Sequence, residues 1–75
     1  MDTLKAILED IRSDIDFDKE KKLIDDSILD SFDIIAIVTE LNNAYGININ
    51  VNHLVPDNLN SIEAMWELVT KLQNS

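Results

Sequence analysis

Residues 30–46, with the sequence DSFDIIAIVTELNNAYG, decide the fold of this chain. Large apolar residues recur there at steps of three, four, seven and eleven positions, which is the period of an α-helix with one buried face. They are Ile34, Ile37, Val38, Leu41 and Tyr45. The Asp-Ser pair at the start offers capping oxygens, and Gly46 enters the left-handed region without a Cβ penalty. The stretch therefore predicts a helix over residues 31–45.

Two further helices are expected on either side of this one. An apolar stripe near the N-terminus predicts a helix over residues 2–13, and it consists of Leu4, Ile7, Leu8 and Ile11. Residues 60–63, Asn-Ser-Ile-Glu, are typical of a capping box, and the stripe that follows predicts a helix over residues 61–73. A short turn of helix is expected around residues 51–55, ending before Pro56, because the residue before a proline is biased away from the helical region.

Residues 14–30 lose the helical period and are predicted to form a long ordered loop. A strand is the alternative for the alternating residues 14–18, but it would have no partner strand. The loop carries apolar residues that can pin it to the core, namely Ile15, Phe17, Leu23, Ile24, Ile28 and Leu29.

Together these elements predict an all-α fold, a small four-helix bundle of three longer helices and one short helix around a single core. The 75 residues are expected to form one domain, residues 1–75. The residues expected to be buried together are Ile7, Ile11, Ile37, Val38, Leu41, Val69 and Leu72.

The composition limits the partners. Fifteen acidic and six basic residues give a net charge of −9, and such a surface repels nucleic acid and anionic membranes. The chain has no run of 18 apolar residues and no signal-peptide pattern at its start. We therefore expect a cytoplasmic monomer that does not insert into membranes and binds basic patches on other proteins. The absence of cysteine excludes disulfides and thiolate zinc sites.

Catalytic chemistry finds little support in the sequence. The single histidine, His53, lies in a polar loop, and a serine triad needs its histidine held between the nucleophile and a third group. No pocket is evident that would shift the pKa of a carboxylate for acid–base work. A calcium loop is an alternative for residues 14–25, because Asp14, Asp16, Asp18 and Asp25 match EF-hand positions. Lys19, where that loop needs glycine, and the lysines near it argue against calcium.

Ser31 is the residue with the most informative surroundings. It lies in the first turn of the predicted helix beside Asp30, where an attached phosphate would find unpaired backbone N–H groups. Ordinary helix capping is the alternative interpretation of this Asp-Ser pair. Phe32 and Ile35 fall on the outward face nearby, which indicates a contact surface unless the loop folds over them.

The run Leu23–Asp33, LIDDSILDSFD, together with the helix as far as Ile47, resembles acyl carrier proteins and the related peptidyl and D-alanyl carriers. The resemblance covers essentially the whole chain, including its length, its acidity, the long first loop and the glycine after an aromatic residue. It implies that Ser31 receives 4′-phosphopantetheine from coenzyme A. It also implies that Asp30 binds the metal and the basic surface of the loading enzyme, and that Phe32 stands where the family has leucine.

By this resemblance the protein is a carrier and not an enzyme. Its arm would hold an acyl or aminoacyl group as a thioester, and Asp30, Phe32, Asp33 and Ile35 would bind partners. Those partners would be a phosphopantetheinyl transferase, an acyl- or amino-acid-activating ligase and an acceptor enzyme. The outward face of the second helix lacks the acidic row of fatty-acid carriers, and the core residues are bulky, so a short or aminoacyl cargo is expected. The alternative function is an unmodified acidic helical module that binds a basic partner.

Overall fold

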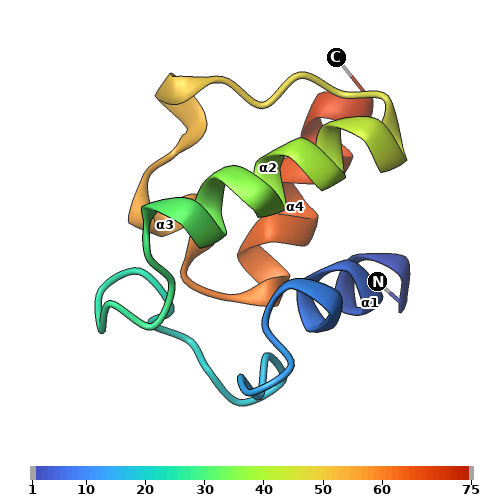
Figure 1. Ribbon diagram of the computed structural model, residues 1–75. Coiled ribbons are helices and arrows are strands. Elements are labelled where there is room, and N and C mark those ends of the chain that lie inside the picture. The colour runs from blue at the N-terminus through green and yellow to red at the C-terminus, as the bar shows by residue number, and fades with distance from the viewer. Residues whose placement is uncertain (1, 75) are drawn as a thin grey trace.

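The computed structural model describes residues 2–74 and is helical throughout its regular elements, with no strand in that range (Figure 1). In chain order the elements are α1 (Asp2–Ile11), α2 (Ser31–Tyr45), the 3₁₀ turn η1 (Val51–His53), α3 (Pro56–Leu59) and α4 (Ile62–Gln73). The predicted all-α class, with three longer helices and one short one, is confirmed.

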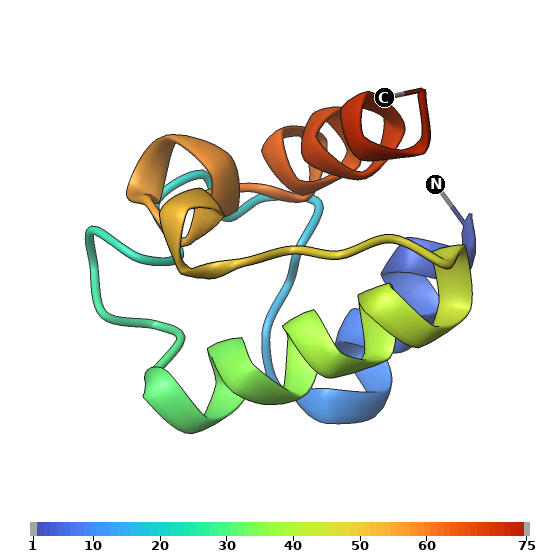
Figure 2. The same cartoon turned by 90° about the horizontal axis from the view of Figure 1, so that it is seen from above.

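Helix α2 packs against α1, and α4 contacts both of them. The segment after α2 turns back and runs along that helix, so η1 and α3 return to the end of the molecule where α2 begins (Figures 1 and 2). The loop 12–30 reaches the same end from α1. None of the helices within residues 2–74 is both long enough and apolar enough to cross a membrane.

Helix α2 begins and ends where the sequence predicts. The side chain of Asp30 accepts a hydrogen bond from the Asp33 N–H at 2.9 Å, and the Asp33 carboxylate accepts from the Asp30 N–H at 3.4 Å. Gly46 ends the helix with φ at 62°, in the left-handed region. Reciprocal capping and the glycine stop thus fix both ends locally.

Helix α4 ends at Gln73 as expected, but several other helix ends differ from the prediction. Helix α1 stops at Ile11, two residues before the expected end at residue 13. Pro56 opens α3 instead of closing the preceding turn, because proline fits the first helical position, where its missing N–H has no partner to lose. The turn expected over residues 51–55 is confirmed, in shorter form, as η1.

The capping box expected at residues 60–63 is wrong. Ser61 is the N-cap of α4, and its hydroxyl accepts a hydrogen bond from the Ala64 N–H at 3.1 Å. Asn60 instead ends α3, and its side-chain oxygen accepts from the N–H groups of Ile24 and Asp25 at 3.0 and 3.1 Å. Asn60 therefore ties the long loop to the α3–α4 junction.

The expected core is only partly right. Of the seven residues expected to be buried together, three are buried, namely Ile37, Leu41 and Val69. The other four, Ile7, Ile11, Val38 and Leu72, are partly exposed and pack at the edge of the core. On α1 it is Leu4 and Leu8 that face the centre of the core, and both are completely buried.

The loop 12–30 supplies part of this core. Its side chains Phe17, Leu23 and Leu29 are buried among the helices, and the Leu23 N–H donates to the Asn60 carbonyl at 2.9 Å. A long loop with three buried anchors and backbone hydrogen bonds holds one shape. It therefore delivers the chain to the start of α2 in a defined position.

Candidate modification site

Ser31 is the first residue of α2 and is exposed to solvent. Within residues 2–74 its hydroxyl makes no hydrogen bond. The Asp33 N–H is satisfied by the Asp30 side chain, and the Ile34 N–H by the Asp30 carbonyl at 3.0 Å. The capping thus leaves the N–H groups of the first helical residues, including that of Ser31, at the open positive end of the helix.

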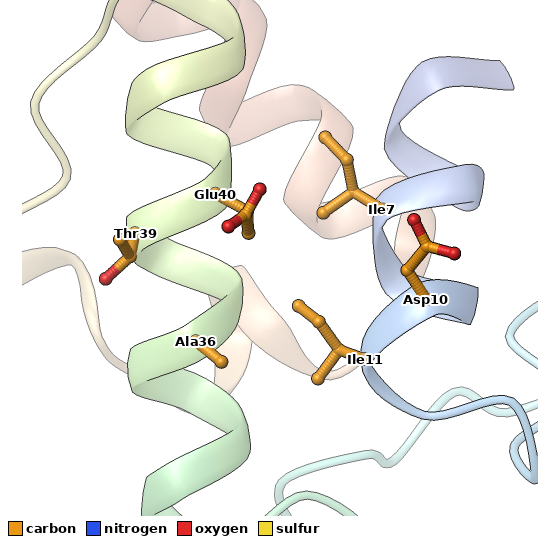
Figure 3. A pocket seen from close by; sticks show the side chains of 6 residues that line it. All are labelled: Ile7, Asp10, Ile11, Ala36, Thr39 and Glu40. Carbon is orange, nitrogen blue, oxygen red and sulfur yellow. The ribbon is translucent and has the colours of Figure 1, made fainter.

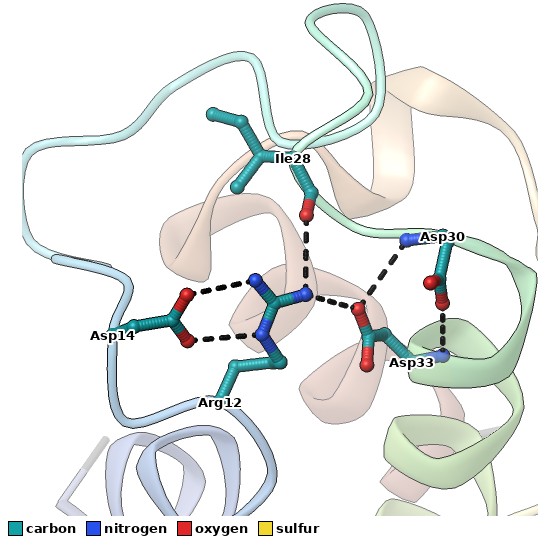
Figure 4. A network of polar contacts seen from close by, with 5 residues as sticks. All are labelled: Arg12, Asp14, Ile28, Asp30 and Asp33. Atoms are coloured by element: carbon teal, nitrogen blue, oxygen red, sulfur yellow. Dashed lines mark hydrogen bonds and ion pairs between the residues drawn. The ribbon is translucent and has the colours of Figure 1, made fainter.

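The carboxylate of Asp33 turns inward to an arginine (Figure 4). Arg12 Nη1 lies 2.5 Å from Asp33 Oδ2, and the Asp33 side chain is only 14% exposed. The same guanidinium donates from Nε and Nη2 to the two oxygens of Asp14, each at 2.9 Å, and from Nη1 to the Ile28 carbonyl at 3.4 Å. One side chain thus links the end of α1, the loop and the first turn of α2 (Figure 4).

The electrostatics of this cluster follow from its hydrogen bonds. The bonds from Arg12 lower the pKa of Asp14 to about 2, from an ordinary value of 3.8. The same bonds, to Asp14 first and to Asp33 second, raise the pKa of Arg12 above its usual range. The pair of Arg12 and Asp14 is therefore ionised at neutral pH.

Two of the predicted contact residues form an exposed apolar pair. Phe32 is 84% exposed and Ile35 is 61% exposed, so the loop does not fold over them. They are three positions apart on α2 and therefore neighbours on its surface. Asp30 is exposed as well, whereas Asp33 is committed to Arg12. The four predicted residues thus divide into three that face solvent and one that faces inward.

Sequence reasoning did not single out two other exposed apolar side chains, Val51 and Val55. They lie in and beside η1, in a stretch rich in asparagine and without helical periodicity. The only sequence feature that could have indicated their exposure is a valine between turn-forming residues, as Val51 is between Asn50 and Asn52. The role of Arg12 was also missed, because no local pattern marks it.

An open groove lies on the surface where α1 and α2 meet (Figure 3). Its lining residues are Ile7, Asp10, Ile11, Ala36, Thr39 and Glu40. The side chains of Ile7 and Ile11 point from α1 towards α2, the carboxylate of Glu40 lies between the two helices, and Asp10 remains on the α1 side (Figure 3). Ser31 does not line this groove, so the groove and the candidate modification site are separate features.

The calcium alternative finds no support in the arrangement of the loop. Asp14 is bound to Arg12, and Asp18 pairs with Lys5 at 2.6 Å. Within the described part of the chain no three acidic, histidine or cysteine side chains are placed to hold a metal ion. The ring of His53 accepts a hydrogen bond from the Asn50 N–H at 3.1 Å, which gives it a role in capping η1.

Comparisons with protein-family models, with curated proteins and with solved structures gave no match to this chain.

Proposed function

We propose that the protein is a carrier in which Ser31 anchors a 4′-phosphopantetheine arm. The arm's terminal thiol would hold an acyl or aminoacyl group as a thioester. The observation that supports this most is the exposed Ser31 hydroxyl, which makes no hydrogen bond within residues 2–74 and lies at the first residue of a helix with a capping box. A phosphate attached there is favoured by the helix dipole and by the N–H groups at the helix end.

The residues around Ser31 fit the loading reaction as an acceptor. The serine oxygen would form a phosphodiester with the phosphopantetheine phosphate of coenzyme A, and 3′,5′-ADP would leave with the electrons of the broken P–O bond. The hydroxyl proton must go to a base. Within residues 2–74 none is hydrogen-bonded to Ser31, so in this proposal the transferase provides that base.

The exposed surface beside Ser31 fits a docking role. Phe32 and Ile35 are apolar contacts that a partner can cover, and the net charge of −9 steers the chain towards basic surfaces. The partners are a phosphopantetheinyl transferase, an activating ligase and an acceptor enzyme. The tether contributes by raising the effective concentration of cargo at each of them.

The proposed cargo is short-chain acyl or aminoacyl. Ile37 and Leu41 fill the inner face of α2 and are almost completely buried. Opening a cavity among such side chains forfeits contacts worth about 2–5 kcal/mol for each large side chain displaced. A short cargo stays outside on the arm without that cost. The test compares amide chemical shifts of octanoyl and alanyl forms, and large core shifts with octanoyl would contradict this assignment.

Intact mass spectrometry tests the carrier function itself. After incubation with coenzyme A and a broad-specificity transferase, the wild type should gain the mass of one phosphopantetheine group. Ser31→Ala should gain none while keeping its helical spectrum, because Asp30 still caps α2. Ser27→Ala is the matched control, because Ser27 also follows an aspartate and is exposed.

Two outcomes would contradict the proposal. Loading of Ser31→Ala would show that the site is elsewhere. Failure of the wild type to load, with a transferase that loads an authentic carrier in the same tube, would favour the unmodified interaction module instead.

A further inference from the structure

One arginine joins the start of the long loop to its end and to the first turn of α2. Arg12 follows the last residue of α1 and binds Asp14 in the loop with two nitrogens. Its third nitrogen reaches Ile28 at the end of the loop and Asp33 in the first turn of α2. The two ends of the long loop are thereby closed onto one another (Figure 4).

The contact with Asp33 acts on the residues on either side of Ser31. The Asp33 oxygen held by Arg12 also accepts from the Asp30 N–H, and Asp30 in turn accepts from the Asp33 N–H. Ser31 lies between these two residues in the sequence. Fixing Asp33 therefore fixes the backbone from which the Ser31 hydroxyl projects.

We infer that Arg12 is a positioning residue for Ser31, acting through Asp33 to hold the helix start in the orientation that a transferase needs. This inference rests on the proposed function for its kinetic consequence, whereas the ordering of the helix start is independent of that function. Arginine suits the role because its planar fork bonds Asp14 with two donors while a third reaches Asp33. The lowered pKa of Asp14 agrees with an ionised pair at neutral pH.

The two carboxylates on Arg12 provide a matched pair of variants. Asp14 and Asp33 both bind the guanidinium, but only Asp33 belongs to the capping pair around Ser31. Asp33→Asn should disturb the presentation of Ser31, whereas Asp14→Asn should leave it intact. Because the Asp33 side chain is 14% exposed and that of Asp14 is 67% exposed, urea unfolding of both variants is measured in parallel, so that a loss of stability is not taken for a change in presentation.

Loading kinetics give the first readout. For Arg12→Gln and Asp33→Asn we expect kcat of phosphopantetheine transfer to fall about tenfold, the scale of one lost charge-assisted hydrogen bond, with KM changed less than about twofold. Asp14→Asn should change neither. In the double variant Arg12→Gln/Asp33→Asn, kcat should fall no further than in either single variant. If the two substitutions acted independently, their effects on kcat would multiply.

Backbone dynamics of the unloaded protein give a readout that needs no transferase. Amide order parameters of Ser31 and Phe32 should drop from about 0.85 towards 0.6 in Arg12→Gln and Asp33→Asn, and stay high in Asp14→Asn. If the wild type is never loaded, the proposed function fails while this measurement still tests the positioning. Equal behaviour of the Asp14 and Asp33 variants, or unchanged order in Arg12→Gln, would overturn the inference.

Discussion

Truncation of Phe32 tests whether the surface beside Ser31 is a docking surface. Phe32 is 84% exposed, so Phe32→Ala removes a ring that contributes little to the folded chain. We expect the free energy of unfolding to change by less than about 0.5 kcal/mol, as for other surface substitutions. The effect should instead appear in binding to the transferase.

The size of that effect follows from the area that a partner can cover. Full burial of an aromatic side chain removes on the order of 150–250 Å² from water. A partner that covers about half of the ring gains about 2–3 kcal/mol, at about 25 cal/mol per Å². A loss of about 2 kcal/mol lowers kcat/KM of loading about 30-fold. Because the contact forms on docking, the change should appear mainly as a higher KM.

The assay is the initial rate of phosphopantetheine transfer as a function of carrier concentration, with urea unfolding measured in parallel. Phe32→Leu is the matched control, because it keeps an apolar side chain and should stay within about fivefold of the wild type, since such swaps change contact area modestly. Unchanged loading by Phe32→Ala would refute the docking role. A loss of more than about 1 kcal/mol of stability would refute the independence of this side chain from the core.

Three further predictions concern the loop and the charges. Phe17→Ala should cost about 3–5 kcal/mol in urea unfolding, because Phe17 is buried; a cost below about 1 kcal/mol would mean that the loop is not packed. The pKa of Asp14 is about 2 when folded and 3.8 ordinarily, so its pairing with Arg12 stabilises the fold above that range. The stability difference between wild type and Asp14→Asn should thus be constant from about pH 7 to 5 and vanish between about pH 4 and 2, and a difference that persists at pH 2 would contradict the assignment. Asp30→Asn keeps a capping oxygen but removes a charge beside Ser31, so its loading rate should fall less steeply with rising salt concentration than that of the wild type. Identical salt dependence of the two loading rates would exclude steering by Asp30.

The sequence predicted those parts of the fold that local rules determine. Helix α2 was placed correctly because its cap, its apolar period and its glycine stop all lie within residues 30–46. The exposure of Phe32 and Ile35 followed from their angle on that helix. These features depend on neighbours in the chain and on no distant contact.

The errors arose where distant contacts decide between local alternatives. Asn60 and Ser61 are both residue types that cap helices well, and Ser61 is the N-cap of α4. The side chain of Asn60 is instead hydrogen-bonded to Ile24 and Asp25 in the loop, which precede it by 36 and 35 positions. The role of Arg12 was hidden for the same reason, since Asp33 lies 21 positions later. Charged residues without periodicity carry no sequence signal of their partners.

The internal pairing of Asp33 changes how the acidic surface near Ser31 should be understood. Two acidic residues lie within two positions of that serine, and the sequence alone suggests two charges for a basic partner. Because Asp33 is held by Arg12, the charge that remains available beside Ser31 is that of Asp30. The apolar pair Phe32 and Ile35 then provides most of the contact that a partner can gain at short range. In the proposed carrier, long-range steering would come from the net charge, whereas recognition at the serine would be predominantly apolar.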